Sequence, residues 1–235
     1  MGISRITTQL SVSSAFGVYI NQKMADSYDA YLQNHRLAIS LAWKQIKDKI
    51  DFSSENIRTM YYLLSIHDSS KYREKEYFPF LVKYYANDHN EESEEAYKEA
   101  WKHHYSTNPH HWRFWVNNGE GKEIPYVYML EMILNWHAKS LGNPELTAVN
   151  QYEEERNSII LNDITREKLE KVIGFFNKPV EIPIEMKNSE IGYKIFENQK
   201  TIIKNEENTE SSDSPEIQND DRADFAIADK TILEL

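Results

Sequence analysis

Glycine and proline are scarce in this chain, with only seven of each among 235 residues. β-Sandwiches and β-barrels need many tight turns, in which these two residues are common. Apolar side chains instead recur every three or four positions, as in the stripe from Tyr28 to Ile46, and this spacing places them on one face of an α-helix. The 15 tyrosines, 9 phenylalanines and 5 tryptophans supply large side chains for a core. The sequence therefore predicts an all-α fold.

The pattern changes twice along the chain, which predicts three segments. Residues 1–20 show neither a helical nor a strand period and are expected to form a flexible arm. Residues 21–178 are expected to form the helical domain, with a serine at position 53 or 54 capping its second helix and Thr165 capping its last. The predicted helices cover 21–50, 55–67, 73–86, 94–105, 125–141 and 165–176. Residues 179–235 are expected to be extended or disordered, because acidic and small polar residues replace the apolar pattern there.

The formal net charge of −11 is concentrated near the C-terminal end. Residues 205–235 carry ten acidic and two basic side chains, a balance of −8. No basic stripe is present to neutralise a phosphate backbone, so we expect no stable partner of duplex nucleic acid. The acidic tail is instead suited to a basic protein partner. No apolar run approaches the roughly 18 residues of a membrane span, and residues 1–20 lack the pattern of a secretory signal. We therefore expect a cytoplasmic protein with no membrane partner.

The chain contains no cysteine, so any metal ligands must be imidazoles, carboxylates, amides or water. His35 and His67 lie within apolar helical stripes, where either residue alone is more often a core residue than a ligand. Asp68 follows His67 at the predicted end of a helix, where the chain can turn the carboxylate back toward its neighbour. Together the three side chains predict a divalent-metal site formed by two helices.

Glu131 and Asn135 are two further candidate ligands, placed one helical turn apart. They belong either to a solvated helix face or to the metal site. The residues around them are nearly all apolar, from Met129 to Trp136. A polar pair enclosed by such residues must find partners or cost several kcal/mol. This context favours the metal site.

The segment AWKHHYSTNPHHWRFW at 100–115 holds four histidines within nine positions. It predicts either an aromatic corner of the core or a substrate-facing loop, in which His104 or His111 reaches a second metal ion or a phosphate. The sequence does not decide which member of each histidine pair points inward. Lys71, three residues after Asp68, is either a solvated lysine or a cation that offsets the charge of a substrate phosphate.

The order of these motifs resembles an uncharacterised family of small bacterial and phage proteins, which is similar to the HD superfamily of metal-dependent phosphohydrolases. The resemblance rests on His35, HDSSK at 67–71, the segment at 100–115 and EMILNW at 131–136. It covers about residues 28–175 and implies an HD-domain-like helical bundle. It implies that His35, His67 and Asp68 are the first three metal ligands. His104 and His111 would match the additional histidines of two-metal members, with His103 and His110 competing for those roles. Asn135 stands where the superfamily has its last aspartate ligand.

The resemblance implies hydrolysis of a small phosphorylated substrate, a phosphomonoester or a phosphodiester such as a nucleotide. The expected cofactor is a divalent metal ion, with Mn, Fe, Co, Ni, Zn and Mg as the candidates. Asp68 would bind the metal and orient the attacking water, while Lys71, His104 and His111 would stabilise the phosphoryl charge or protonate the leaving oxygen. Three alternatives remain: a non-catalytic metal- or nucleotide-binding protein, a phage or host interaction scaffold, and a di-iron oxygenase. The amide at Asn135 supports the first of them.

Overall fold

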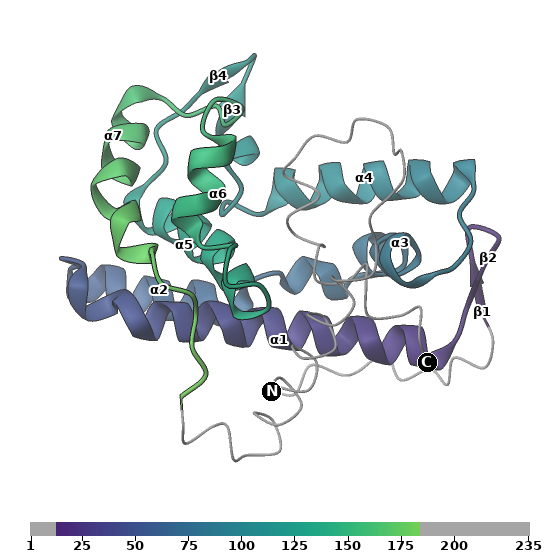
Figure 1. Ribbon diagram of the computed structural model, residues 1–235. Coiled ribbons are helices and arrows are strands. Elements are labelled where there is room, and N and C mark those ends of the chain that lie inside the picture. The colour runs from purple at the N-terminus through teal and green to yellow at the C-terminus, as the bar shows by residue number, and fades with distance from the viewer. Residues whose placement is uncertain (1–12, 184–235) are drawn as a thin grey trace.

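The computed structural model describes residues 13–183, which form an all-α domain with two small β-hairpins (Figure 1). The α-helices are α1 (Gln22–Ile46), α2 (Ser54–Ile66), α3 (Glu74–Tyr85), α4 (Glu91–Thr107), α5 (Tyr126–Ala138), α6 (Ala148–Glu155) and α7 (Asp163–Val172). Short 3-10 helices are η1 (Lys47–Lys49), η2 (Ser69–Tyr72), η3 (Trp112–Trp115), η4 (Lys139–Leu141) and η5 (Ile173–Phe176). The predicted all-α fold is confirmed.

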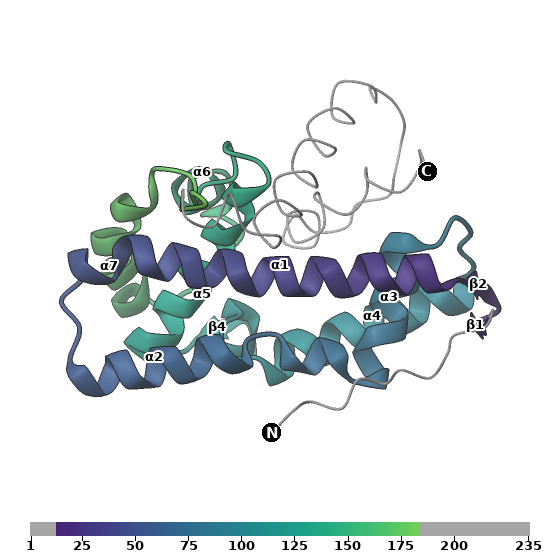
Figure 2. The same cartoon turned by 90° about the horizontal axis from the view of Figure 1, so that it is seen from below.

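Helix α1 runs along the whole domain and packs on two separate hydrophobic clusters. Figure 2 shows α3 and α4 beside its N-terminal half and α2, α5 and α7 beside its C-terminal half. The first cluster includes Tyr28 of α1 with Phe80 of α3 and Trp101 of α4. The second includes Trp43 of α1 with Leu130 of α5. The last residue of α1 in the first cluster is Leu32 and the first in the second cluster is Ala38, so His35 lies at the junction.

Helix α5 is enclosed by other helices, which decides the status of its polar pair. It contacts α1, α2, α6 and α7. Eleven of its residues are buried, including Glu131 and Asn135. The solvated-face interpretation of these two residues is therefore wrong. A carboxylate and an amide that are buried in an apolar helix must have polar partners in the protein interior.

The N-terminal part of the described chain differs from the expected arm. Strands β1 (Ser13–Ala15) and β2 (Val18–Ile20) form an antiparallel hairpin before α1. Phe16 and Gly17 connect them, both with positive φ, and such two-residue turns match the twist of paired strands. The side chain of Ile20 is fully buried, so the hairpin closes one end of the first cluster. Residues 1–12 of the expected arm lie outside the described residues.

Two further features of the structure were not predicted from the sequence: a second hairpin and an extension of the domain at its C-terminal end. The second hairpin, β3 (Val116–Asn117) with β4 (Glu120–Gly121), occupies part of the loop before α5. At the C-terminal end, Val180 and Ile182 are buried, so the chain continues to pack against the domain beyond the predicted boundary at 178. The acidic tail predicted from residue 205 lies outside the described residues.

The helix caps agree with the sequence in one case and not in another. Ser53 caps α2, as predicted, by accepting a hydrogen bond from the backbone N–H of Asn56. Helix α7, by contrast, is capped by Asn162 and not by Thr165. Thr165 lies inside the first turn, fully buried, and its hydroxyl accepts a hydrogen bond from the backbone N–H of Ile124 at 3.0 Å. The threonine is therefore a tertiary anchor for the chain entering α5.

Replacing Thr165 with valine should destabilise the fold, because it keeps the side-chain shape but removes the acceptor. We expect the free energy of unfolding to fall by about 1–3 kcal/mol, the usual effect of a buried donor left without a partner. Thr165→Ser keeps the hydroxyl and should cost only about 0.8 kcal/mol for the lost methyl group. Urea unfolding of the three proteins measures this. A valine variant as stable as the wild type would show that the hydrogen bond contributes nothing.

No helix among residues 13–183 is long and apolar enough to cross a membrane.

Candidate metal centre

The C-terminal end of α2 brings Asp68 into the interior. The helix ends at Ile66, and Asp68 has a left-handed backbone conformation with φ of 56°. Few residues with a side chain adopt this conformation, although aspartate tolerates it better than most. It stops the helix and turns the chain into η2. The carboxylate of Asp68 is consequently buried, with 2% of the residue exposed.

Three imidazoles approach one oxygen of the Asp68 carboxylate. Oδ1 lies 3.3 Å from Nε2 of His110, 3.4 Å from Nε2 of His104 and 3.7 Å from Nε2 of His67. The three rings come from the end of α2, from α4 and from the turn after α4. Residues distant in sequence thus converge on a single oxygen atom.

The other oxygen, Oδ2, faces two cationic or potentially cationic groups. It lies 3.7 Å from Nε2 of His35 on α1 and 3.0 Å from Nζ of Lys71. The same His35 nitrogen lies 2.9 Å from Oδ1 of Asn135 on α5. Lys71 is only 2% exposed, so its interpretation as a solvated lysine is wrong. The structure pairs it with Asp68.

Several buried atoms of this cluster lack hydrogen-bond partners. Among the described residues, the buried polar atoms without a partner include Oδ1 of Asp68 and the Nε2 atoms of four histidines, His67, His104, His110 and His111. Each such atom costs about 1–3 kcal/mol when left unsatisfied. The Nε2 atoms of His67, His104 and His110 lie within 3.7 Å of Oδ1 of Asp68, and one cation could be a partner for all four atoms, since imidazole nitrogen and carboxylate oxygen are both metal ligands.

A carboxylate holds the far side of one of these rings. Oε1 of Glu131 lies 2.9 Å from Nδ1 of His67 and 3.8 Å from Nδ1 of His110. Glu131 accepts a hydrogen bond from the Nδ1–H of His67, which leaves the lone pair of His67 on Nε2, facing Asp68. The geometry favours a supporting role for Glu131, although its oxygen also lies in a group with His67 and His110 that can hold a metal ion.

The ligand atoms fall into overlapping groups around Asp68. One group consists of His35, His67 and Asp68, and another of His104, His110 and His111, with the ligand atoms in each group within 4.8 Å of one another. Of these rings, His35 is nearest Oδ2 of Asp68, whereas His67, His104 and His110 are nearest Oδ1, so the carboxylate does not separate the two groups. The arrangement can hold one divalent ion or two.

The protonation states suit metal binding in most of the cluster. Burial raises the pKa of Asp68, but the Lys71 ammonium and the surrounding imidazoles outweigh it and hold this pKa well below its usual range. Burial and neighbouring rings lower the pKa of His110 and, further, that of His111. The pKa of His104 is raised, because two carboxylates outweigh the opposing effects of burial and Lys71. An ionised carboxylate and neutral imidazoles are what a metal requires of its ligands.

The structure brings all the predicted site residues into this one cluster. They are His35, His67, Asp68, Lys71, His104, His111, Glu131 and Asn135. Within the first histidine pair, His104 faces Asp68 and His103 does not. Within the second pair both rings are buried, and His110 has the shorter distance to Asp68. The buried Glu76, which contacts His103 and His104, was not predicted.

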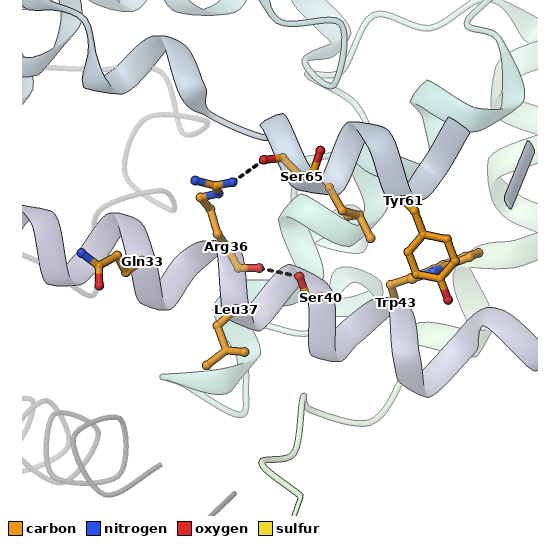
Figure 3. A pocket seen from close by; sticks show the side chains of 8 residues that line it. Gln33, Arg36, Leu37, Ser40, Trp43, Tyr61 and Ser65 are labelled. Atoms are coloured by element: carbon orange, nitrogen blue, oxygen red, sulfur yellow. Dashed lines mark hydrogen bonds between the residues drawn. The ribbon is translucent and has the colours of Figure 1, made fainter. Parts of the chain in front are cut away.

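A groove of about 460 Å³ lies between α1 and α2 (Figure 3). None of the residues that line it belongs to the metal cluster. Trp43, Tyr61 and Leu64 line its apolar part. Arg36 reaches across it and donates a hydrogen bond to the backbone oxygen of Ser65. That oxygen belongs to the last turn of α2, where carbonyl groups lack partners within the helix. Arg36 therefore secures the helix end from which the chain leaves toward the cluster.

Comparison with known proteins identifies one relationship. The model of a protein family described as a family of unknown function, DUF5662, matches residues 24–174. This range covers nearly all of α1 through α7 and contains every residue of the cluster. No curated protein and no solved structure matches the chain.

Proposed function

The chain belongs to the DUF5662 family, and we propose from its buried cluster that it is a metal-dependent phosphohydrolase. The proposal depends on one observation above all: the Nε2 atoms of His67, His104 and His110 converge on Oδ1 of Asp68, and none of these four buried atoms has a hydrogen-bond partner among the described residues. The resemblance of the same motifs to the HD superfamily supports the choice of reaction. Fold and motif likeness are analogies, so the chemistry must be argued from the site.

The donor set favours some metals over others. It is rich in imidazole, with one carboxylate at its centre and no thiolate, since the chain has no cysteine. Imidazole nitrogen suits Fe, Co, Ni and Zn, whereas Mn²⁺ and Mg²⁺ are bound mainly by oxygen ligands. We therefore place Mn²⁺ and Mg²⁺ last among the candidate cofactors.

Each side chain has a role in the proposed hydrolysis. A bound divalent ion would polarise a phosphoryl oxygen and lower the pKa of a water molecule. Asp68 would be a ligand of that ion and, through its ionised carboxylate, would orient the water. Lys71, whose Nζ lies 3.0 Å from Asp68, supplies positive charge for the phosphoryl group. His111, buried beside His104, would donate an N–H hydrogen bond to the phosphoryl group, since burial lowers its pKa and keeps the ring neutral.

A second candidate function is metal or nucleotide binding without turnover. It is favoured by the contact between His35 and Asn135, in which an amide oxygen lies 2.9 Å from the ligand nitrogen. An amide brings no negative charge, so a metal ion on that side of Asp68 would be bound less strongly than beside a second carboxylate. The first three ligands could then hold a metal ion without activating a water molecule.

One experiment separates these functions. The full chain, purified without a histidine tag, would be analysed by mass spectrometry for metal content and then assayed with bis-p-nitrophenyl phosphate, p-nitrophenyl phosphate and a panel of nucleotides. Bound metal with metal-dependent release of phosphate or alcohol would support the phosphohydrolase. Bound metal with no turnover of any substrate would favour the binding protein. A folded chain that takes up no metal on reconstitution would contradict both.

A further inference from the structure

Glu76 is a buried carboxylate that no motif pointed to. It lies in the first turn of α3 and is 0% exposed. Its Oε2 lies 2.9 Å from Nδ1 of His104 and accepts a hydrogen bond from the hydroxyl of Ser70 at 2.8 Å. Its Oε1 lies 2.6 Å from Nδ1 of His103. Both oxygens are therefore used, and one of them contacts a ring of the metal cluster.

The contact between Glu76 and His104 determines which ring nitrogen of His104 carries the proton and which carries the lone pair. An ionised carboxylate only accepts hydrogen bonds, so the Nδ1 atom opposite it carries the proton. In the neutral ring the other nitrogen, Nε2, then carries the lone pair. Nε2 of His104 lies 3.4 Å from Oδ1 of Asp68 and has no hydrogen-bond partner. The ring is thus presented to the cluster in the form that binds a cation.

The orientation of Glu76 is itself held by a chain of hydrogen bonds. The side-chain amide of Asn108, just after α4, donates to the hydroxyl oxygen of Ser70 at 2.9 Å. Because this oxygen is already an acceptor for Asn108, its own hydrogen is directed toward Glu76. The N-terminal turn of α3 adds a favourable partial positive charge near the carboxylate. Glu76 is consequently fixed before any ligand arrives.

The same device occurs on the opposite side of the cluster. Glu131 on α5 accepts from Nδ1 of His67 at 2.9 Å, as Glu76 on α3 does from His104. Two carboxylates from different helices thus hold two rings whose Nε2 atoms face Asp68. Hydrogen bonds of this kind, from a ligand imidazole to a carboxylate outside the metal, raise the basicity of the ligand and fix its tautomer.

We infer that Glu76 is a positioning residue of the metal centre, which sets the tautomer and direction of His104 for cation binding. The inference rests on the metal site of the proposed function. It does not depend on the substrate or on turnover. Glu76 does not bind the cation itself, because both of its oxygens are occupied by other partners.

The test is the isosteric change Glu76→Gln. An amide keeps one acceptor oxygen and no negative charge, so it cannot accept from both His103 and His104, and the ring that faces its N–H group must accept with Nδ1 and carry its proton on Nε2. We expect the affinity for Zn²⁺ or Co²⁺, measured by competition with a chromogenic chelator, to fall about 10- to 100-fold. His103→Gln is the matched control: it removes the other partner of Glu76 but no ring that faces Asp68, and the affinity should stay within about twofold of the wild type.

A second readout needs no metal. The ¹⁵N shifts of His104 in the metal-free protein at pH 9 report which ring nitrogen carries the proton. The wild type should show the Nδ1–H form, and Glu76→Gln should show an increased share of the Nε2–H form. If Glu76→Gln does not fold, Ser70→Ala replaces it, because it removes one donor to Oε2 and should weaken cation binding several-fold. An unchanged tautomer and unchanged affinity would overturn the inference. A wild type that binds no cation but shows the expected tautomers would instead overturn the proposed function.

Discussion

Asp68→Asn is expected to empty the metal centre. The carboxylate of Asp68 is within 3.7 Å of four imidazole nitrogens, and no other described carboxylate is placed in this way. An amide removes the negative charge and turns an N–H group toward at least one ring. Metal content should fall from near one or two ions per chain to near zero, measured by mass spectrometry after identical purification. Asp48→Asn, at an exposed position, is the control for a carboxylate-to-amide change and should keep the full metal content.

The same variant should also lose stability, for a separate reason. Lys71 is buried and would lose its partner at 3.0 Å. Breaking a buried ion pair on one side costs about 3–5 kcal/mol. Adding Lys71→Met to Asp68→Asn removes the buried cation that has lost this carboxylate, so the double variant should recover much of the lost stability while still binding no metal. Metal retained by either variant would show that Asp68 is not the central ligand.

Lys71→Met alone is expected to separate binding from catalysis. The change removes a buried ammonium group that we assign to the phosphoryl group, but it removes no metal ligand. We expect kcat to fall by about 10²- to 10³-fold, the usual effect of losing one charge-stabilising donor in an active site. The metal content should remain near that of the wild type. The measurement is kcat per bound metal ion, on whichever phosphoester the wild type hydrolyses.

Lys83→Met provides the control for this change. Lys83 pairs with Glu94 on the outside of α3 and α4, so its loss should leave kcat unchanged. If Lys71→Met keeps both its metal and its kcat, then Lys71 is only the counter-ion of Asp68, and the phosphoryl charge must be met elsewhere.

The helices and most residues of the metal cluster could be predicted, because the spacing of apolar residues shows where the helices lie and which of their faces are buried. The stripe of α1 places His35 in line with Leu32 and Ile39 on the buried side. The sequence alone leaves the choice between His103 and His104 open, and the structure settles it: Tyr97, Ala100, Trp101 and His104 are buried at helical spacing on one face of α4. His110 and His111 lie in the turn after α4, where no period applies, and both proved to be buried.

Glu76 could not be predicted because its local sequence resembles a surface. It stands in the charged run REKEY at 73–77, and its neighbours Glu74 and Lys75 are exposed. Only the packing of α3 against α4 shows that Glu76 points to His104. The hairpin before α1 was missed for a different reason. Its strands have three residues each, too few to establish an alternating pattern.

The candidate metal centre lies between the two hydrophobic clusters, and this position has a consequence for how the protein unfolds. α1 and α4 supply His35 and His104, while α5 and the end of α2 supply Asn135 and His67, so a cation would be bound by groups from both halves of the domain. The bound cation would then link the two halves, and its binding free energy would be lost if either half unfolded. Withdrawing the cation should leave each half to its own core and turn one cooperative transition into two.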